Sequence, residues 1–173
     1  MNKWLWLPAV AIVAPFSAHA TVYYTAEQAQ QVLFPGATFT KAFVTLTDAQ
    51  AAEIEKRSGG VNVRNKDIQM WKVSTGGYFL LDQAVGKHEF ITLAMGLNAD
   101  GSFKDFQVLE YKETYGFQVK DADWRKQFAG KTASSTLQLN SDIKNISGAT
   151  LSCQHITDGI KRVLVTQAVL SGK

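Results

Sequence analysis

The chain has 173 residues and a formal net charge of +3 at pH 7, from 18 lysines and arginines against 15 aspartates and glutamates. Charges of both signs are mixed along the sequence, which argues against a nucleic-acid-binding protein because that class needs a strongly basic surface. Cys153 is the only cysteine, so an internal disulfide and a Cys-x-x-Cys-His haem site are excluded. A chain with one cysteine is compatible with an oxidising compartment.

The first 20 residues have the layout of a secretory signal peptide. Lys3 precedes an apolar stretch, residues 4–16, and Ala18-His19-Ala20 forms a small-x-small cleavage site. The apolar stretch is shorter than the roughly 20 residues that a membrane-spanning helix needs, and a retained anchor is the alternative interpretation. We therefore expect residues 1–20 to be removed and residues 21–173 to form one exported, periplasmic domain.

Two helices are predicted at the start of the mature chain. Each begins with a threonine followed three positions later by a glutamine, which is the capping-box pattern, and each ends before a Pro-Gly step or a glycine pair. The helices are expected from Thr25 to Phe34 and from Thr47 to Lys56. Residues 39–46, which lie between them, alternate in the manner of a strand.

The middle of the chain is rich in β-formers. Short runs separated by glycine-containing turns predict an antiparallel meander of about four strands, at residues 68–74, 77–82, 88–98 and 103–113. Helices on both sides of such a run in the sequence indicate an α+β fold, in which a single domain has an antiparallel sheet flanked by helices.

The last third of the chain is expected to contain two more helices. Asp121 or Asp123 is placed to cap a short helix that runs through Phe128 and closes at a glycine, and residues 132–139 are a candidate for a further strand. Residues 153–170 repeat apolar side chains at spacings of three and four, which predicts a long helix with one packed side and one wet side.

The turn before that long helix, residues 147–152, is a candidate phosphate site. Gly148 and Ala149 remove side-chain bulk, so a ligand can approach the backbone, and Thr150 offers a hydroxyl where the helix begins. A helix start carries about half a positive charge and unpaired amides, here those of Leu151 and Ser152, which favours a phosphate ester. Ordinary helix capping could use the same residues.

The sequence Ser147-Gly148-Ala149-Thr150, followed by Leu151-Ser152, resembles the flavinylation motif of the FMN-binding domain family. This domain occurs in the C subunit of the sodium-pumping NADH:quinone reductase and in the G subunit of Rnf complexes, where the last threonine of the motif carries FMN through a phosphoester installed by an ApbE-type flavin transferase. The resemblance therefore implies covalent FMN on Thr150. The chain departs from the family at Lys144, where Asp is usual; it has an Asp at Asp142 instead.

Three other segments resemble the family in the same order, so the resemblance covers roughly residues 86–165. Residues 111–116 are similar to its His-x-Glu-Thr-Pro-Gly segment, residues 123–131 to its Trp-x-x-x-Phe-x-Gly-Lys stretch, and residues 95–101 to the strand and turn ahead of both. The resemblance places Glu113, Thr114, Tyr115 and Gly116 beside the isoalloxazine ring. Without it, Glu113 would be interpreted as a solvated strand end.

Other candidate side chains have ordinary interpretations as well. Tyr111, Phe117 and Trp124 could wall a flavin or simply pack. A second Gly-Ala-Thr, ending at Thr38, lacks the preceding serine and the following amphipathic helix, and is expected to be a turn. Cys153 and His155, two positions apart on a helix, point away from each other and do not form a nucleophilic pair.

These patterns support one functional hypothesis and leave one alternative. The hypothesis is an exported flavoprotein that carries FMN on a threonine and transfers electrons between redox partners, with no catalytic residues and no metal site of its own. Its expected partners are an ApbE-type flavin transferase and a membrane or periplasmic redox protein. The alternative is a secreted non-redox binding or accessory domain that has lost flavinylation.

Overall fold

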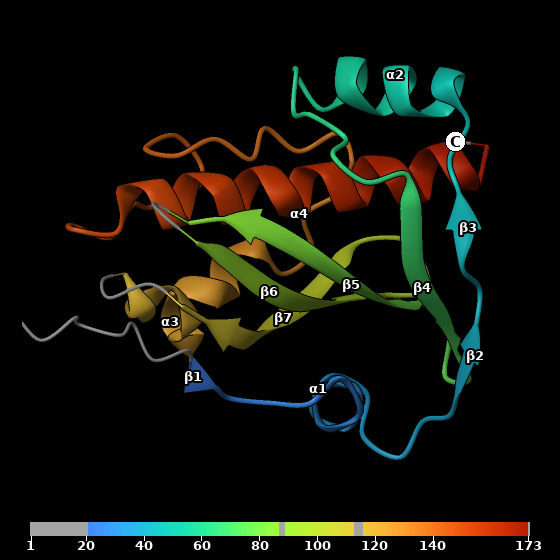
Figure 1. The fold of residues 1–173 in the computed structure, drawn as a ribbon, viewed down its shortest axis with the longest axis horizontal. Helices are drawn as coiled ribbons and strands as arrows, with labels where there is room; N and C mark the ends of the chain where they lie inside the picture. Colours follow the sequence, from blue (N-terminus) through green and yellow to red (C-terminus); the bar gives the residue numbers. More distant parts are fainter. Residues whose placement is uncertain (1–20, 87–88, 113–115, 173) are drawn as a thin grey trace, which may run out of the picture.

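The computed structural model describes residues 21–86, 89–112 and 116–172. An antiparallel sheet has a long helix, α4 (Thr150–Leu170), across one face and a short helix, α1 (Ala26–Leu33), against the other (Figure 1). This single α+β domain confirms the predicted fold class. The expected signal peptide, residues 1–20, lies outside the described residues.

The sheet is built around the predicted meander. Its strands lie in the order β1-β7-β6-β5-β4-β2, with β3 also paired to β4, and every pairing between them is antiparallel. The strands are β1 (Thr21–Val22), β2 (Phe39–Lys41), β3 (Val44–Thr45), β4 (Asp67–Val73), β5 (Tyr78–Val85), β6 (Phe90–Leu97) and β7 (Phe103–Tyr111). The four predicted strands correspond to β4–β7, so glycine turns and β-rich runs were sufficient to locate them.

Alternate residues of the central strands supply two separate cores, because successive side chains of a strand point to opposite faces. On β5, Leu80 joins the larger core beneath α4, whereas its neighbour Phe79 joins the smaller core with Ala29 and Leu33 of α1. Burial of these apolar side chains, at roughly 25 cal/mol per Å² removed from water, holds both helices to the sheet.

Both N-terminal helices begin with the predicted capping boxes. Thr25 caps α1 and Thr47 caps α2 (Asp48–Arg57), and in each helix the side-chain oxygen of the glutamine three positions later accepts from the backbone N–H of the capping threonine. The prediction of one continuous strand over residues 39–46 is wrong, because two short strands form there. The edge strand is interrupted between β2 and β3, at Ala42 and Phe43, where the Phe43 ring packs edge-on against Trp71 with 4.7 Å between ring centroids.

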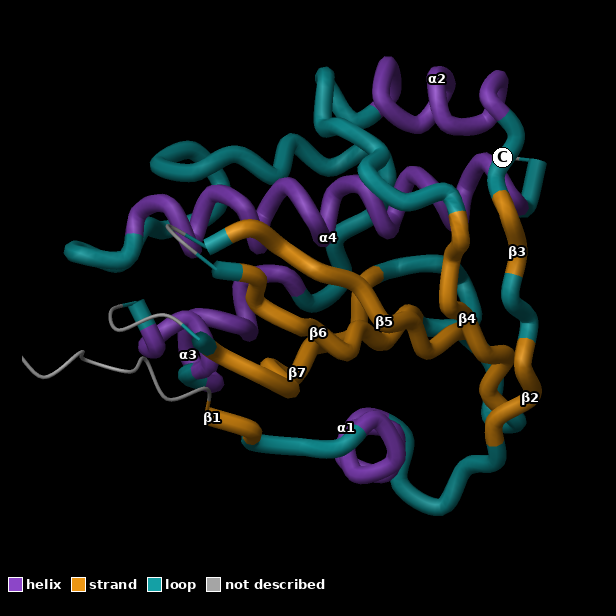
Figure 2. Tube along the Cα trace, in the orientation of Figure 1, coloured by secondary structure: helices purple, strands orange, loops and turns teal. Residues whose placement is uncertain are grey.

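Helix α4 begins at Thr150, three residues before the apolar repeat predicted for residues 153–170. The side of the helix that was predicted to face solvent is not exposed along its whole length. Every residue from position 163 to 168 is buried. The outer side of this half is covered by α2, where Ile54 joins Val165 in a third apolar cluster (Figure 2). Residues 131–140 also lie near this outer side, and Lys161 Nζ donates to Thr136 O at 3.1 Å. A helical periodicity cannot anticipate a second layer from elsewhere in the chain.

The segment before α4 is less regular than predicted. The short helix is split into α3 (Ala122–Arg125) and a 3₁₀ turn, η2 (Lys126–Phe128), and a second 3₁₀ turn, η1 (Phe117–Lys120), precedes it. Asp121 occupies the N-cap position of α3 but makes no side-chain capping bond. The candidate strand at residues 132–139 is wrong, because turns form there and Leu139 makes an isolated bridge with Ile143.

Among the helices of the described residues, none is long and apolar enough to cross a membrane.

Candidate functional site

Thr150 is the first residue of α4 and is exposed at one end of the molecule (Figure 1). The turn before it is tight, since Gly148 has a φ of +82° and Ala149 N donates to Ile146 O at 3.0 Å. Ala149 is buried, so it anchors the turn, whereas a Cβ added at Gly148 would meet nothing within 4 Å. Among the described residues, the turn therefore leaves open space beside Gly148, two positions before the threonine.

The start of α4 presents backbone amides that no hydrogen bond within the helix uses. The first backbone bond of the helix runs from Cys153 N to Ala149 O at 2.9 Å, so the amides of Thr150, Leu151 and Ser152 precede it and have no acceptor within the helix. The N-cap residue is an alanine, which has no side chain that could accept from them. These donors and the helix dipole favour an anion at this end.

The loop that carries Thr150 is held by α3 and η2. Trp124 Nε1 donates to Lys144 O at 2.7 Å, and Lys144 N donates to Gln127 Oε1 at 2.7 Å. The Trp124 ring is buried and packs edge-on against Phe128, with 5.0 Å between ring centroids. Trp124 therefore packs in the core, which is one of its two predicted roles, and its indole supports the loop through Lys144 O. Both backbone groups of Lys144 are thus fixed, and its side chain faces solvent.

Gly116 closes the predicted Tyr111–Gly116 segment onto the first turn of α4. It has a φ of +87°, and a Cβ placed there would lie 2.8 Å from Tyr111 Oη, 3.0 Å from Ser152 Oγ and 3.3 Å from Ala149 Cβ. Tyr111 Oη and Ser152 Oγ, from residues 41 positions apart, are 3.4 Å from each other. Two of the segments that resemble the family, residues 111–116 and residues 147–152, therefore meet in space.

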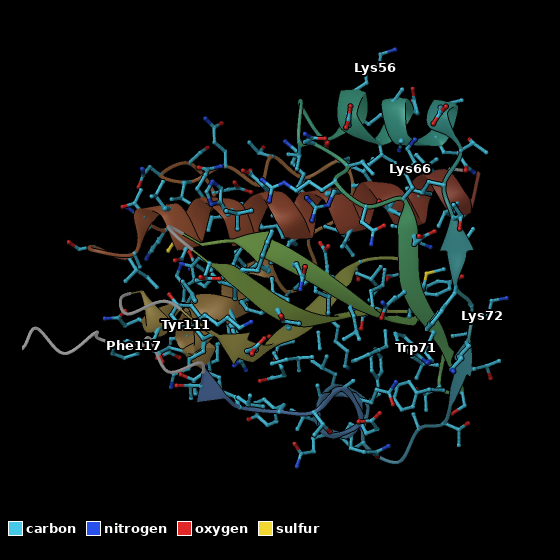
Figure 3. All side chains as sticks on the ribbon, viewed as in Figure 1. Lys56, Lys66, Trp71, Lys72, Tyr111 and Phe117 are labelled. Carbon is cyan, nitrogen blue, oxygen red and sulfur yellow. The ribbon has the colours of Figure 1, made fainter. Side chains whose placement is uncertain are left out.

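Glu113, Thr114 and Tyr115 lie outside the described residues, so their predicted roles beside a flavin ring stay predictions. The residues on either side of them reach the same end of the molecule (Figure 3). Tyr111 is buried, and Phe117 is 49% exposed. Leu151, which follows Thr150, is also 49% exposed, so this end presents apolar as well as polar surface.

Asn145 was missed by sequence reasoning. Its Nδ2 donates to Thr150 Oγ1 at 2.9 Å, and its Oδ1 is a buried atom without a hydrogen-bond partner in the described part of the chain. A buried acceptor left unpaired costs about 1–3 kcal/mol, so such atoms usually mark a missing ligand or water. A lone asparagine in a loop gives no periodic or motif signal, and only its distance to Thr150 reveals it.

The other predicted residues of the turn have distinct positions. Ser147 is exposed, whereas Ser152 is buried. Cys153 is buried, and burial raises the pKa of its thiol. His155 Nδ1 lies 2.5 Å from Val85 O, so its ring is held by β5, as expected if it forms no pair with the cysteine.

Asp142 does not stand in for an acidic residue at position 144. Partial burial would raise the pKa of its carboxyl, but hydrogen bonds from Gln138 N, Lys131 Nζ and Leu137 N outweigh burial and lower it to about 2. Its oxygens accept from Gln138 N at 2.8 Å, Leu137 N at 3.1 Å and Lys131 Nζ at 2.8 Å. Asp142 therefore fixes the preceding loop.

Two sequence features lie away from this site. The turn at Gly101 packs against Gln167, near the far end of α4. A Cβ added at Gly101 would lie 2.9 Å from Gln167 Oε1. Thr38, in the second Gly-Ala-Thr, precedes a strand, and its amide donates to Ser74 Oγ at 3.0 Å. The predicted turn is present at Pro35 and Gly36, and Thr38 itself lies just after it. A hollow of about 420 Å³ begins one turn beyond Thr150, where Gln154 and His155 face β5.

Residues 86–165, which contain every contact described around Thr150, match the family model of the FMN-binding domain. The match assigns this segment to the FMN-binding domain family and supports FMN as its cofactor. No curated protein matches the chain.

The residues at the start of α4 fit FMN. A hydroxyl and three amides without an acceptor in the helix are suited to a phosphate group, and the open space beside Gly148 gives access to them. The unpaired Oδ1 of Asn145 is suited to one of the hydroxyl or N–H donors that a flavin nucleotide carries.

Proposed function

We propose that the chain is an exported flavoprotein in which FMN is esterified to Thr150 and which passes electrons between two redox partners. The observation that carries the proposal is the position of Thr150: its hydroxyl is exposed at the start of α4, within a segment that matches the FMN-binding domain. FMN, when bound, supplies reversible redox chemistry of its own.

Each nearby residue has a defined task in this proposal. Thr150 Oγ1 forms the ester, and the amides of Leu151 and Ser152 with the positive end of the α4 dipole stabilise the phosphate charge. Gly116 keeps the end of β7 close to that turn. The exposed Leu151 and Phe117 cover apolar ring surface and limit its contact with water.

The attachment reaction is a phosphoryl transfer without a change of redox state. Thr150 Oγ forms a bond to the FMN phosphorus of a flavin adenine dinucleotide, the bond from that phosphorus to the AMP leaving group breaks, and the hydroxyl proton is released. An ApbE-type flavin transferase is the proposed catalyst, because the described residues around Thr150 Oγ1 offer an amide donor and no base within hydrogen-bond distance.

Export gives covalent attachment a physical reason. A protein outside the cytoplasm that releases its cofactor loses it by dilution, whereas an ester does not dissociate. The predicted signal peptide, residues 1–20, supports the periplasm as the location. Cell fractionation with amino-terminal sequencing tests this part, and the mature chain is expected to start at Thr21.

The attachment is tested by the intact mass of protein produced with and without an active flavin transferase. With the transferase, the mass should rise by that of FMN less one water, and peptide mapping should locate the gain on Thr150. Thr150→Ala should remain unmodified and Thr150→Ser should accept some flavin. Thr38→Ala, in the second Gly-Ala-Thr, is the matched control and should load fully.

Electron transfer is tested on the loaded protein by a spectroscopic redox titration and by reduction with candidate membrane fractions. Reversible bleaching of the flavin band, at a rate that depends on the donor, is expected. A colourless mature protein from its native periplasm, with a bare Thr150 peptide, would instead favour the secreted accessory domain.

A further inference from the structure

Asn145 is placed to act on Thr150. Its Nδ2 is 2.9 Å from Thr150 Oγ1, and its Oδ1 is a buried atom that no described residue contacts by a hydrogen bond. Exchanging the two amide atoms does not remove the difficulty, because the threonine hydroxyl can also donate to an oxygen and the amide nitrogen would then be the unpaired group. Either orientation leaves one polar atom of the Asn145 amide without a hydrogen-bond partner among the described residues, on a side chain that already contacts Thr150 Oγ1.

The backbone holds Asn145 in this position. Lys144, directly before it, has its amide bound by Gln127 and its carbonyl bound by Trp124. Directly after it, Ile146 O accepts from Ala149 N at 3.0 Å. These bonds hold the backbone on both sides of Asn145, and the hydrogen bond to Thr150 Oγ1 holds its side chain.

We infer that Asn145 is a positioning residue for the flavin ester, an inference that rests on the proposed attachment to Thr150. Its Nδ2 donates to Thr150 Oγ1 before and after the ester forms, since an ester oxygen still accepts a hydrogen bond. Its Oδ1 accepts from a hydroxyl of the ribityl chain. The ribityl hydroxyls are the donors nearest to the phosphate along FMN, whereas the phosphate itself offers acceptors and the ring N–H lies at the far end.

The adjacent residue provides a matched control. Lys144 contributes its backbone to the loop, while its side chain faces solvent, so Lys144→Ala removes a charge next to Asn145 without removing either hydrogen bond of the loop. If a cation near the phosphate were what matters, Lys144→Ala would slow attachment and Asn145→Ala would not.

The test measures the rate of covalent loading by intact mass, with flavin adenine dinucleotide and an active transferase, for the wild type and for Asn145→Ala, Asn145→Asp and Lys144→Ala. Asn145→Ala should load about tenfold more slowly, the factor that corresponds to one hydrogen bond lost from the reacting group. Lys144→Ala should load within about twofold of the wild type, because neither bond is touched.

Asn145→Asp gives a readout that a merely structural role would not move. An ionised carboxylate keeps the acceptor, loses the donor and repels the phosphate, so loading should be slow near pH 8. A protonated carboxyl offers a donor on one oxygen and an acceptor on the other, so it can make both of the bonds assigned to the amide. The ratio of the variant's rate to the wild-type rate should therefore rise as the pH falls from about 8 to about 5.

The outcomes separate this inference from the proposed function. Equal loading rates for wild type and Asn145→Ala, with a pH-independent ratio for Asn145→Asp, would overturn the inference and leave the attachment intact. A wild-type chain that stays unmodified, while the same transferase loads a second substrate protein, would overturn both. Slow loading of Asn145→Ala together with recovery of Asn145→Asp at low pH supports the inference.

Discussion

Gly116→Ala tests whether the close approach between the end of β7 and the start of α4 is rigid. The substituted Cβ would lie 2.8 Å from Tyr111 Oη and 3.0 Å from Ser152 Oγ, and the backbone would keep a φ of +87°. Both neighbouring side chains are buried, so neither can move freely away. We expect a destabilised apoprotein and slower flavin loading, because Ser152 and Thr150 share the first turn of α4.

The expected loss in free energy of unfolding has two parts, which a control substitution separates. A left-handed backbone costs a non-glycine residue about 1–2 kcal/mol, and overpacking a closed site costs about 1–3 kcal/mol more. Gly116→Ala should therefore lower the free energy of unfolding by about 2–5 kcal/mol. Gly130 has a φ of +75° and nothing within 4 Å of an added Cβ, so Gly130→Ala should lose only the first part, about 1–2 kcal/mol.

The assay is urea unfolding of the apoproteins followed by circular dichroism. Tyr111→Phe, which removes the nearest atom, is combined with Gly116→Ala in a double-mutant cycle, and a favourable coupling of about 1–2 kcal/mol is expected. Equal losses for Gly116→Ala and Gly130→Ala, with no coupling to position 111, would refute the idea of a rigid approach.

Three further predictions concern the surroundings of the site. Trp124→Phe removes the indole donor to Lys144 O and should cost about 1–2 kcal/mol in urea unfolding, while the final extent of loading stays complete. The pKa of Asp142 is about 2 in the folded chain against 3.8 ordinarily, so its stabilisation is present above about pH 4 and is lost as the pH falls towards 2. Acid unfolding should show a loss of about 1–2 kcal/mol over that window, and Asp142→Asn should remove this pH dependence. Cys153 is buried and the pKa of its thiol is raised, so it should react with a thiol reagent at the rate of unfolding; fast reaction in the native protein would contradict its burial.

Features encoded locally could be predicted from the sequence. The capping boxes at Thr25 and Thr47 involve groups three residues apart, so the residues themselves determine the structure. The same holds for the glycine turns of the meander. The composition of the turn at residues 147–152 placed the start of the last helix at Thr150, where the structure has it.

Features that depend on distant residues could not be predicted. Residues 132–139 have a strand-like composition, but Leu137 N and Gln138 N donate to the carboxylate of Asp142 and not to a neighbouring strand. The outer side of α4 is covered by α2, where Ile54 packs with Val165. Because α2 comes from a distant part of the chain, the periodicity of α4 alone does not show that this side is covered. Asn145 acquires its role only because the turn folds it back onto Thr150.

The pairing of Thr21 with Tyr111 determines which end of the chain can carry a fusion partner. Tyr111 also reaches Ser152, so Thr21 lies at the same end of the molecule as the proposed flavin site. The carboxyl end follows α4, whose 21 residues extend about 30 Å away from Thr150 (Figure 1). An affinity tag or a linker to an electrode placed after residue 173 leaves the site free for a transferase or a redox partner, whereas the same group placed before Thr21 stands in their way.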